Sequence, residues 1–321
     1  MKPVTHGGDL SAIRNRYPRA PEPWIDLSTG INPVPYPVTH FPTEIWSRLP
    51  TRQQEKALLE AAALRYGVRD PATIVAAPGT QSLIQLLPRL VPKSRVAVVG
   101  PTYEEHEVCW TRQGHAVEVG ASLGKAMSAE VVVVVNPDNP TGRLLPGTAL
   151  RRFGGLLVVD EAFVDLLPSD ASLTPDLPDN AIVLRSFGKT YGLAGVRLGF
   201  AIAEKAIAAR IRDELGPWPV SGPALEIGRQ ALADQAWLEA ATSRLADDRR
   251  KLDVLLVSAG FVILGGTTLF CLAHHQNAAE LVERLGRGGI HVRRFDREPH
   301  WLRFGLPADD GAFKRVEAAL S

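Results

Sequence analysis

The sequence has few cysteines and almost no excess charge of either sign. Cys109 and Cys271 are its two cysteines, and they form neither a disulfide framework nor the spacing of a zinc site. Its 36 basic and 35 acidic residues give a net charge of +1, which indicates no nucleic-acid or membrane-surface footprint. We therefore expect two buried cysteines, no metal, and no nucleic-acid or membrane partner.

Long apolar runs are also missing. No run approaches the ~18 residues of a membrane-spanning helix, and the N-terminus has no apolar region of the kind found in signal peptides. With 45% hydrophobic residues, the 321-residue chain can still bury a large core. These features predict a cytoplasmic protein with one large domain or two moderate ones.

Short apolar runs alternate with amphipathic stretches through the middle of the chain. The runs that we predict as strands are residues 73–77, 95–99, 131–135, 156–159, 181–184 and 198–203. The stretches that we predict as helices are residues 53–66, 81–90 and 103–113. Strands that alternate with helices predict a parallel α/β sheet. The five consecutive valines at 131–135 predict a strand buried on both faces.

The two ends of the chain have a different character. Residues 1–52 are rich in proline and predict an extended arm, with one short strand near residue 25, that contributes to the small domain and to the active site. After residue 220 the pattern is a long helix at 235–258 followed by short strands and helices, which predicts a smaller α+β domain. The predicted domains are therefore 1–52 for the arm, 53–220 for the large domain and 221–321 for the small one.

The stretch S-F-G-K-T-Y-G-L-A-G-V-R-L-G at residues 186–199 carries the strongest chemical signal. Lys189 lies in a glycine-rich turn after a strand, where burial would lower its pKa and free its lone pair for Schiff-base chemistry. Ser186 and Arg197 could together hold a phosphate. A phosphate beside such a lysine indicates pyridoxal 5'-phosphate (PLP). From this stretch alone, a solvated lysine in a surface turn remains the alternative.

Three further motifs precede that stretch. They are A-P-G-T-Q at residues 77–81, N-P-D-N-P-T-G at 136–142 and V-V-D-E-A-F at 158–163. Gly79 and Thr80 fall at a predicted helix N-terminus, which favours an anion. Asn139, Asp160 and Lys189 each follow an apolar strand, so we expect three strands to bring polar groups to one edge of the sheet.

In their order, these motifs resemble those of the fold-type I PLP enzymes, in particular the class I/II aminotransferase superfamily. The resemblance covers residues 73–303, and it implies a mainly parallel seven-stranded sheet in the large domain and a smaller α+β domain. It implies that Lys189 is the catalytic residue that binds PLP. It gives the other cofactor contacts to Asp160 at the pyridine nitrogen, Asn139 at the phenolic oxygen, Tyr103 on the ring face, and Gly79, Thr80, Ser186 and Arg197 at the phosphate.

The residues alone leave some of these roles open. Asp160 could instead cap a helix, and Tyr103 could be a core tyrosine. Arg303 interrupts an apolar strand, which is costly for a guanidinium unless a carboxylate docks on it. The resemblance implies that Arg303 binds the α-carboxylate of the substrate.

The sequence departs from the superfamily pattern at two places. Phe163 stands where many relatives carry tyrosine, so a hydrogen bond to the ring oxygen is missing. The segment L-P-T at residues 49–51 stands where relatives often carry Y-P-D, whose tyrosine reaches the cofactor phosphate of the partner subunit. The fold class implies a homodimer, and this second departure leaves open whether the partner chain contacts the phosphate.

The arm resembles that of the threonine-phosphate decarboxylase family of cobalamin biosynthesis. The motifs that carry the resemblance are H-G-G-D at residues 6–9 and D-L-S-T-G-I-N-P at 26–33. They imply a lyase that converts L-threonine O-3-phosphate to (R)-1-amino-2-propanol phosphate. His6, Gly30 and Asn32 would then bind the substrate together with a cation, which is Arg293 or Arg294.

Two other functions stay open at this point. One is a histidinol-phosphate or related aminotransferase, because the same catalytic motifs serve both reactions. The other is a non-enzymatic PLP-fold effector-binding domain of a transcription regulator. Such regulators place a DNA-binding domain before the fold, whereas a proline-rich arm stands there in this sequence.

Overall fold

The computed structural model describes residues 7–38 and 40–321 in two compact units. The small unit contains the described part of Met1–Val34, the short segment Pro140–Gly142, and Glu239–Ser321. The large unit contains Pro35–Asn139 and Arg143–Leu238. His6 lies outside the described residues, so its predicted role receives no structural account. No described helix is long and apolar enough to cross a bilayer.

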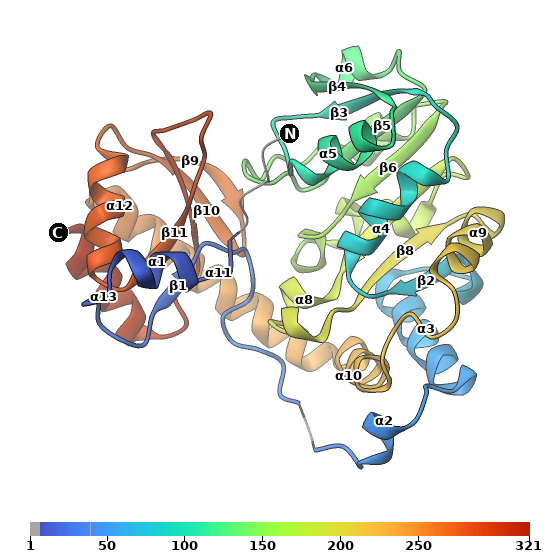
Figure 1. The fold of residues 1–321 in the computed structure, drawn as a ribbon, viewed down its shortest axis with the longest axis horizontal. Helices are drawn as coiled ribbons and strands as arrows, with labels where there is room; N and C mark the ends of the chain where they lie inside the picture. Colours follow the sequence, from blue (N-terminus) through green and yellow to red (C-terminus); the bar gives the residue numbers. More distant parts are fainter. Residues whose placement is uncertain (1–6, 39) are drawn as a thin grey trace. The chain divides into compact units, whose positions relative to one another are not determined.

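The large unit is built on a seven-stranded, mostly parallel sheet, which confirms the predicted α/β fold (Figure 1). The strand order is β2-β8-β7-β6-β5-β3-β4, and β8 alone runs antiparallel to both of its neighbours. The strands are β2 Ile74–Ala77, β3 Arg95–Val99, β4 Ala116–Ala121, β5 Val131–Val135, β6 Leu156–Asp160, β7 Ala181–Ser186 and β8 Gly199–Ala203.

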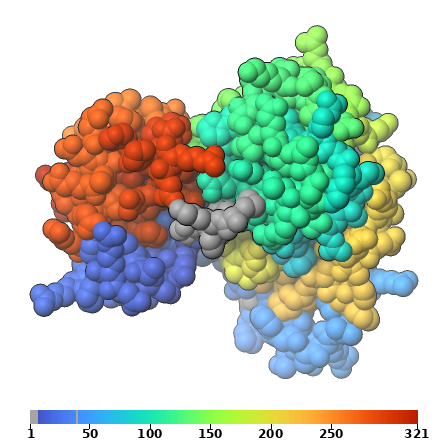
Figure 2. Space-filling model, turned by 45° about the horizontal axis from the view of Figure 1, so that its top comes forward, coloured from blue at the N-terminus to red at the C-terminus, as the bar shows by residue number. Residues whose placement is uncertain are grey.

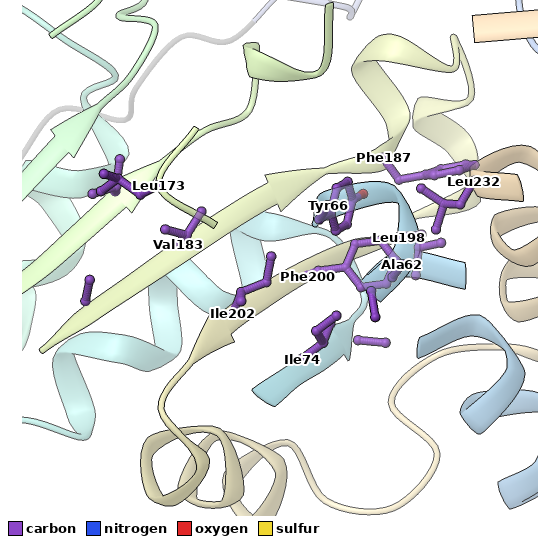
Figure 3. Close-up of a cluster of buried hydrophobic side chains, with 14 of the residues drawn as sticks. Ala62, Tyr66, Ile74, Leu173, Val183, Phe187, Leu198, Phe200, Ile202 and Leu232 are labelled. Atoms are coloured by element: carbon purple, nitrogen blue, oxygen red, sulfur yellow. The ribbon is translucent and has the colours of Figure 1, made fainter. Parts of the chain in front are cut away.

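Apolar side chains cover both faces of this sheet, as the continuous valine run predicts. Val132 and Val134 belong to one buried cluster, and Val131 and Val133 belong to another. The first cluster includes side chains of α3 (Arg52–Tyr66) and α10 (Gly222–Ala233). Figure 3 shows part of it, with Tyr66 near Phe200 and Leu198. The second cluster includes side chains of α4 (Thr80–Leu86), α5 (Glu105–Arg112) and α9 (Lys205–Leu215).

The small unit has a five-stranded sheet of order β1-β11-β12-β10-β9. Its strands are β1 Ile25–Leu27, β9 Val262–Thr267, β10 Phe270–His274, β11 Ile290–Arg294 and β12 Trp301–Gly305. Its helices are α1 Ser11–Arg16, α12 Ala278–Arg287, α13 Asp310–Leu320 and, from Glu239 onward, α11 Gln235–Ser258, whose first residues belong to the large unit. Strand β1 pairs parallel with β11, so this strand of the arm lies against the C-terminal part of the chain (Figures 1 and 2).

Several elements differ from the sequence predictions. The arm contains two short helices, α1 and α2 (Glu44–Ser47), and neither buries a residue, so neither has an apolar stripe to read. The predicted helix at 81–90 ends at Leu86 and continues as a 3₁₀ turn, Leu87–Arg89, because Pro88 cannot continue the α-helix. Strand β4 was not predicted because most of its residues are exposed. Helix α10 starts at Gly222-Pro223, where proline fits the first helical turn and does not break it.

Candidate active site

Three strand ends of the large unit meet at Gly199. Ser186 at the end of β7 and Ala77 at the end of β2 both pair with Gly199, the first residue of β8. A Cβ added to Gly199 would lie 2.6 Å from the backbone nitrogen of Thr80. The absence of a side chain at this position therefore lets the Thr80 amide and Ser186 share one edge of the sheet.

Arg197 completes a cluster of anion-binding groups at this edge. A Cβ added to Gly79 would lie 2.5 Å from Arg197 Nη2, so the guanidinium rests directly on the Gly79 Cα. Arg197 adopts a left-handed backbone with φ of 54°, and its Nη1 donates to the Ala194 carbonyl at 3.1 Å. A guanidinium, a hydroxyl and backbone amides gathered against two glycines fit a phosphate group.

Asp160 ends β6 and is 4% exposed. Its Oδ1 accepts a hydrogen bond from the Ala162 amide at 3.1 Å, and its Oδ2 lies 3.1 Å from His106 Nε2. Two partners make a buried carboxylate tolerable, and each oxygen keeps further acceptor capacity. Such a carboxylate suits a protonated pyridine nitrogen.

Tyr103 is held in place by the A-P-G-T-Q motif. Its Oη donates to Gln81 Oε1 at 3.2 Å, and Gln81 Nε2 donates to Glu105 Oε2 at 2.9 Å. The Tyr103 ring also meets the His106 ring edge-on, with 6.1 Å between centroids. Gln81, which follows the predicted phosphate-binding residue Thr80, therefore orients the ring predicted to stack on the cofactor.

Lys189 lies in the short helix α8, Phe187–Thr190, directly after β7. Its Nζ is 5.0 Å from the centroid of the Phe163 ring. Asn139 follows β5, the strand whose last residue, Val135, pairs with Asp160. All eight residues predicted to bind the cofactor thus belong to the large unit.

The sequence reading missed a buried charge network on the other side of these strand ends. Arg185 Nη1 donates to Glu161 Oε2 at 3.0 Å, and Arg185 Nη2 pairs with Asp165 Oδ1. Glu161 also accepts from Ser172 Oγ at 2.6 Å and from the Leu173 amide at 2.8 Å. Burial raises the pKa of Glu161, although the neighbouring Arg185 opposes that shift.

This network ties together the strands that carry Asp160 and Ser186. Glu161 follows Asp160, and Arg185 precedes Ser186. Neighbouring residues on a strand point to opposite faces, so the ion pair joins the two strand ends from behind. A sequence signal existed, because both charged residues interrupt apolar strands beside candidate site residues. His106 had a comparable signal, since it lies one helical turn after Tyr103.

Arg303 lies on β12 of the small unit and is 7% exposed. Its Nη2 donates to the Ser28 carbonyl at 2.7 Å, and its guanidinium carbon lies 5.1 Å from the centroid of the Phe270 ring. Burial and the nearby Arg293 lower the pKa of Arg303 to about 10. A guanidinium held this way is suited to pairing with an anion.

Arg293 and Arg303 are direct cross-strand partners in the antiparallel pair β11 and β12. Residues opposite each other in such a pair point to the same face, so both guanidinium groups share one side of the sheet. Arg294 pairs with Leu302 and therefore points to the other face. Of the two alternatives that the sequence left open, Arg293 is the one beside Arg303.

Part of the arm packs against Ser28, whose carbonyl accepts from Arg303. A Cβ added to Gly7 would lie 2.6 Å from the Ser28 carbonyl oxygen, and the Gly8 amide donates to Ser28 Oγ at 2.9 Å. Asn32 is buried, and its Oδ1 accepts from Arg244 Nη2 at 2.9 Å and from the Val34 amide. Gly30 is also buried.

Both cysteines are buried, as predicted. Burial raises the pKa of Cys109 to about 11, so its thiol is a poor nucleophile. Within residues 7–38 and 40–321, no three His, Cys, Asp or Glu side chains gather in a way that could hold a metal ion.

A seven-stranded sheet that presents a lysine, a buried aspartate and an anion cluster at one edge defines a PLP-binding fold. The family model for aminotransferase class I and II matches residues 43–315, so the chain belongs to that family. Among curated proteins it is 44% identical to a threonine-phosphate decarboxylase of Sinorhizobium sp, over 99% of this chain and 98% of the relative. It is 39% identical to the enzyme of that name from Pseudomonas aeruginosa, over 99% and 97%.

Solved structures show the same fold. Histidinol-phosphate aminotransferase from Sinorhizobium meliloti in complex with PLP matches with a TM-score of 0.82 at 23% identity, over 99% of this chain and 94% of that one. L-threonine-O-3-phosphate decarboxylase from Porphyromonas gingivalis matches with a TM-score of 0.74 at 20% identity, over 92% and 98%. The comparisons confirm the resemblance to the superfamily and to its decarboxylase branch, and they confirm PLP as the cofactor.

Proposed function

We propose that this chain is a PLP-dependent lyase that releases CO₂ from L-threonine O-3-phosphate and forms (R)-1-amino-2-propanol phosphate for cobalamin biosynthesis. Two curated relatives that share this chain's full length carry the decarboxylase name. The structural observation that carries the proposal is the cross-strand pair of Arg293 and Arg303. Two guanidinium groups on one face suit a substrate with two anionic groups, a carboxylate and a phosphate.

The large unit holds the cofactor in this proposal. PLP supplies, when bound, a conjugated ring that accepts the electron pair left on the substrate Cα when a bond to it breaks. Asp160 keeps a proton on the ring nitrogen, and His106 and the Ala162 amide fix the orientation of its carboxylate. The cluster of Gly79, Thr80, Ser186 and Arg197 binds the phosphate, Tyr103 stacks on the ring, and Asn139 donates to the ring oxygen.

Lys189 has two tasks in this scheme. Its Nζ attaches the cofactor, and after CO₂ leaves it delivers a proton to the substrate Cα. The Phe163 ring, whose centroid is 5.0 Å from Lys189 Nζ, restricts where that nitrogen can lie and adds no second hydrogen bond to the ring oxygen.

The small unit binds the substrate anions in this proposal. Arg303 takes the carboxylate and Arg293 the phosphate. His6, Gly30 and Asn32 stay predicted contacts, and the bonds of Asn32 to Arg244 and Val34 favour an indirect role that shapes the pocket. Anchors at both ends of a short substrate would fix its orientation, and that orientation would decide which bond to the substrate Cα breaks.

We also propose that the chain acts as a homodimer. The exposed large apolar side chains of the large unit include Trp46 at 67%, Leu49 at 66% and Trp218 at 58%. The backbone of Ile45 in α2 packs against Gly222, the first residue of α10. Trp46 and Leu49 lie near Ile45 in the chain, and Trp218 lies four residues before Gly222, so the three exposed side chains come from adjoining segments. A second copy of this chain would bury them. The cytoplasmic location stays a prediction.

The test of the proposed reaction is a pair of assays run on the PLP-loaded protein. We expect CO₂ from L-threonine O-3-phosphate without any 2-oxo acid. We expect no glutamate from 2-oxoglutarate when histidinol phosphate is the amino donor. Rapid glutamate formation without CO₂ would favour the aminotransferase, and binding of PLP without either activity would favour an effector-binding domain.

A further inference from the structure

The segment Pro140–Gly142 groups with the small unit, although Asn139 before it and Arg143 after it belong to the large unit. The Thr141 carbonyl accepts a hydrogen bond from the Gly266 amide of β9 at 2.8 Å. The backbones then meet without intervening side chains. A Cβ added to Gly142 would lie 1.8 Å from the Gly266 oxygen, and a Cβ added to Gly265 would lie 2.2 Å from the Thr141 oxygen. Only glycine fits on either side of this contact.

Strand β9 is itself held firmly where it meets the segment. Arg249 of α11 donates through Nη1 to the carbonyls of Thr267 at 2.6 Å and Phe270 at 2.9 Å. Its Nη2 donates to the Gly265 carbonyl at 3.2 Å, and its Nε donates to Asp253 at 2.8 Å. The guanidinium thus fixes the β9–β10 turn, so β9 offers a rigid surface to the segment.

The same contact lies at one end of a row of paired residues. Gly265 pairs with Leu272 on β10, Leu272 pairs with Arg303 on β12, and Arg303 pairs with Arg293 on β11. The segment next to Asn139 is therefore paired to the same sheet that carries both proposed substrate arginines.

We propose that Gly142 and Gly265 are positioning residues that set the place of the Asn139 amide through the one peptide bond joining Asn139 to Pro140. Their close backbone approach holds segment 140–142 on β9. This inference rests on the proposed function for the roles of Asn139 and Arg303. A displacement of about 1 Å at a site of this kind can reduce a rate by about 100-fold.

The test compares Gly142→Ala with Gly216→Ala. Both glycines have a positive φ, +73° and +72°, but a Cβ on Gly216 would meet nothing within 4 Å. Both variants should lose some thermal stability, because alanine is disfavoured at positive φ. We expect only Gly142→Ala to shift the pH at which the visible absorption of bound PLP changes, since that pH depends on the bond from Asn139 to the ring oxygen.

Kinetics give a second readout. We expect Gly142→Ala to lower kcat by roughly 100-fold while KM stays within threefold, because Arg293 and Arg303 remain in their own sheet. Gly265→Ala, which meets Thr141 from the other side, should give the same spectral shift. If either alanine variant fails to fold, Arg249→Lys loosens β9 without adding atoms and should shift the absorption in the same direction.

The proposal would be overturned if Gly142→Ala and Gly216→Ala had the same pH dependence of PLP absorption and the same kcat. Where the alanine variants do not fold, an unchanged pH dependence of PLP absorption in Arg249→Lys would overturn it. The absorption titration needs PLP but no substrate. It therefore tests the inference even if the protein releases no CO₂ from L-threonine O-3-phosphate, an outcome that would count against the proposed function alone.

Discussion

Asp160 and Arg303 show how single polar groups are accommodated inside apolar strands. Asp160 lies against a histidine and a backbone amide, and Arg303 donates to a backbone carbonyl. Each has enough partners to be tolerated in the protein, and each keeps capacity for a ligand of opposite charge. The candidate site is therefore built from groups whose desolvation is partly offset before any ligand arrives.

Lys189 gives the first prediction at this scale. Borohydride reduction of the PLP-loaded protein followed by peptide mapping should place a pyridoxyl group on Lys189. Lys189→Ala should leave at most trace turnover, because both cofactor attachment and proton delivery are lost. A label on another lysine, or substantial turnover by the variant, would contradict the assignment.

Arg303 gives a second prediction, on pH. Its pKa is lowered to about 10, so it is charged below that pH and loses its charge as pH rises through it. An unreactive substrate analogue without an amino group should therefore bind with constant affinity below about pH 9 and more weakly above about pH 10. The analogue is needed because the amino group of the substrate titrates in the same range.

Arg303→Lys is the matched variant. A lysine starts from a pKa of about 10.4, and the same burial lowers it further, so the loss of affinity should move to lower pH. Isothermal titration across the pH range measures both curves. Curves that coincide, or that show no fall in the wild type, would mean that Arg303 does not hold the anion.

At the scale of elements, the ends of β6 and β7 are joined by side chains on the face opposite the candidate cofactor site. Ser186 and Asp160 face the candidate cofactor site, and the buried pair of Arg185 and Glu161 joins the same strands from the opposite face. Removing one partner of a buried ion pair leaves the other charge without compensation and is more costly than breaking an exposed pair.

Glu161→Gln should therefore lower the free energy of unfolding by about 3 kcal/mol. The control is Glu214→Gln, which breaks the more exposed pair with Arg89 and should cost at most about 1 kcal/mol. Urea unfolding of both proteins without cofactor measures the difference. Equal losses would show that the buried pair adds no more to stability than the exposed one.

Elements with a strong apolar pattern could be predicted from the sequence, and the others could not. The valine run of β5 and the capped helix α3, with Thr51 and Gln54 in a capping box, lie where the pattern places them. Strand β4 and helix α1 could not be predicted, because their exposed residues give no periodic apolar pattern. The candidate cofactor residues were readable because they sit in short motifs after strands. The choice of Arg293 over Arg294 required the register of β11 against β12.

At the scale of the whole molecule, the exposed side chains of Trp46, Leu49 and Trp218 predict association between two copies of the chain. Sedimentation should show a dimer that Trp46→Ser combined with Leu49→Ser weakens at least tenfold. Val257→Ser on α11 of the small unit, where the valine is 57% exposed, is the control and should leave the dimer unchanged. A catalytically competent monomer in the wild type would contradict the proposal.

The most direct test of the account is the fate of the substrate carboxylate. PLP-loaded protein should be mixed with L-threonine O-3-phosphate labelled with ¹³C in the carboxyl group, without any 2-oxo acid, and followed by NMR. We predict that the label moves entirely into CO₂ and bicarbonate while one new phosphate signal, that of 1-amino-2-propanol phosphate, grows at the same rate. A label that stays in an organic acid, or turnover that begins only when 2-oxoglutarate is added, would contradict it.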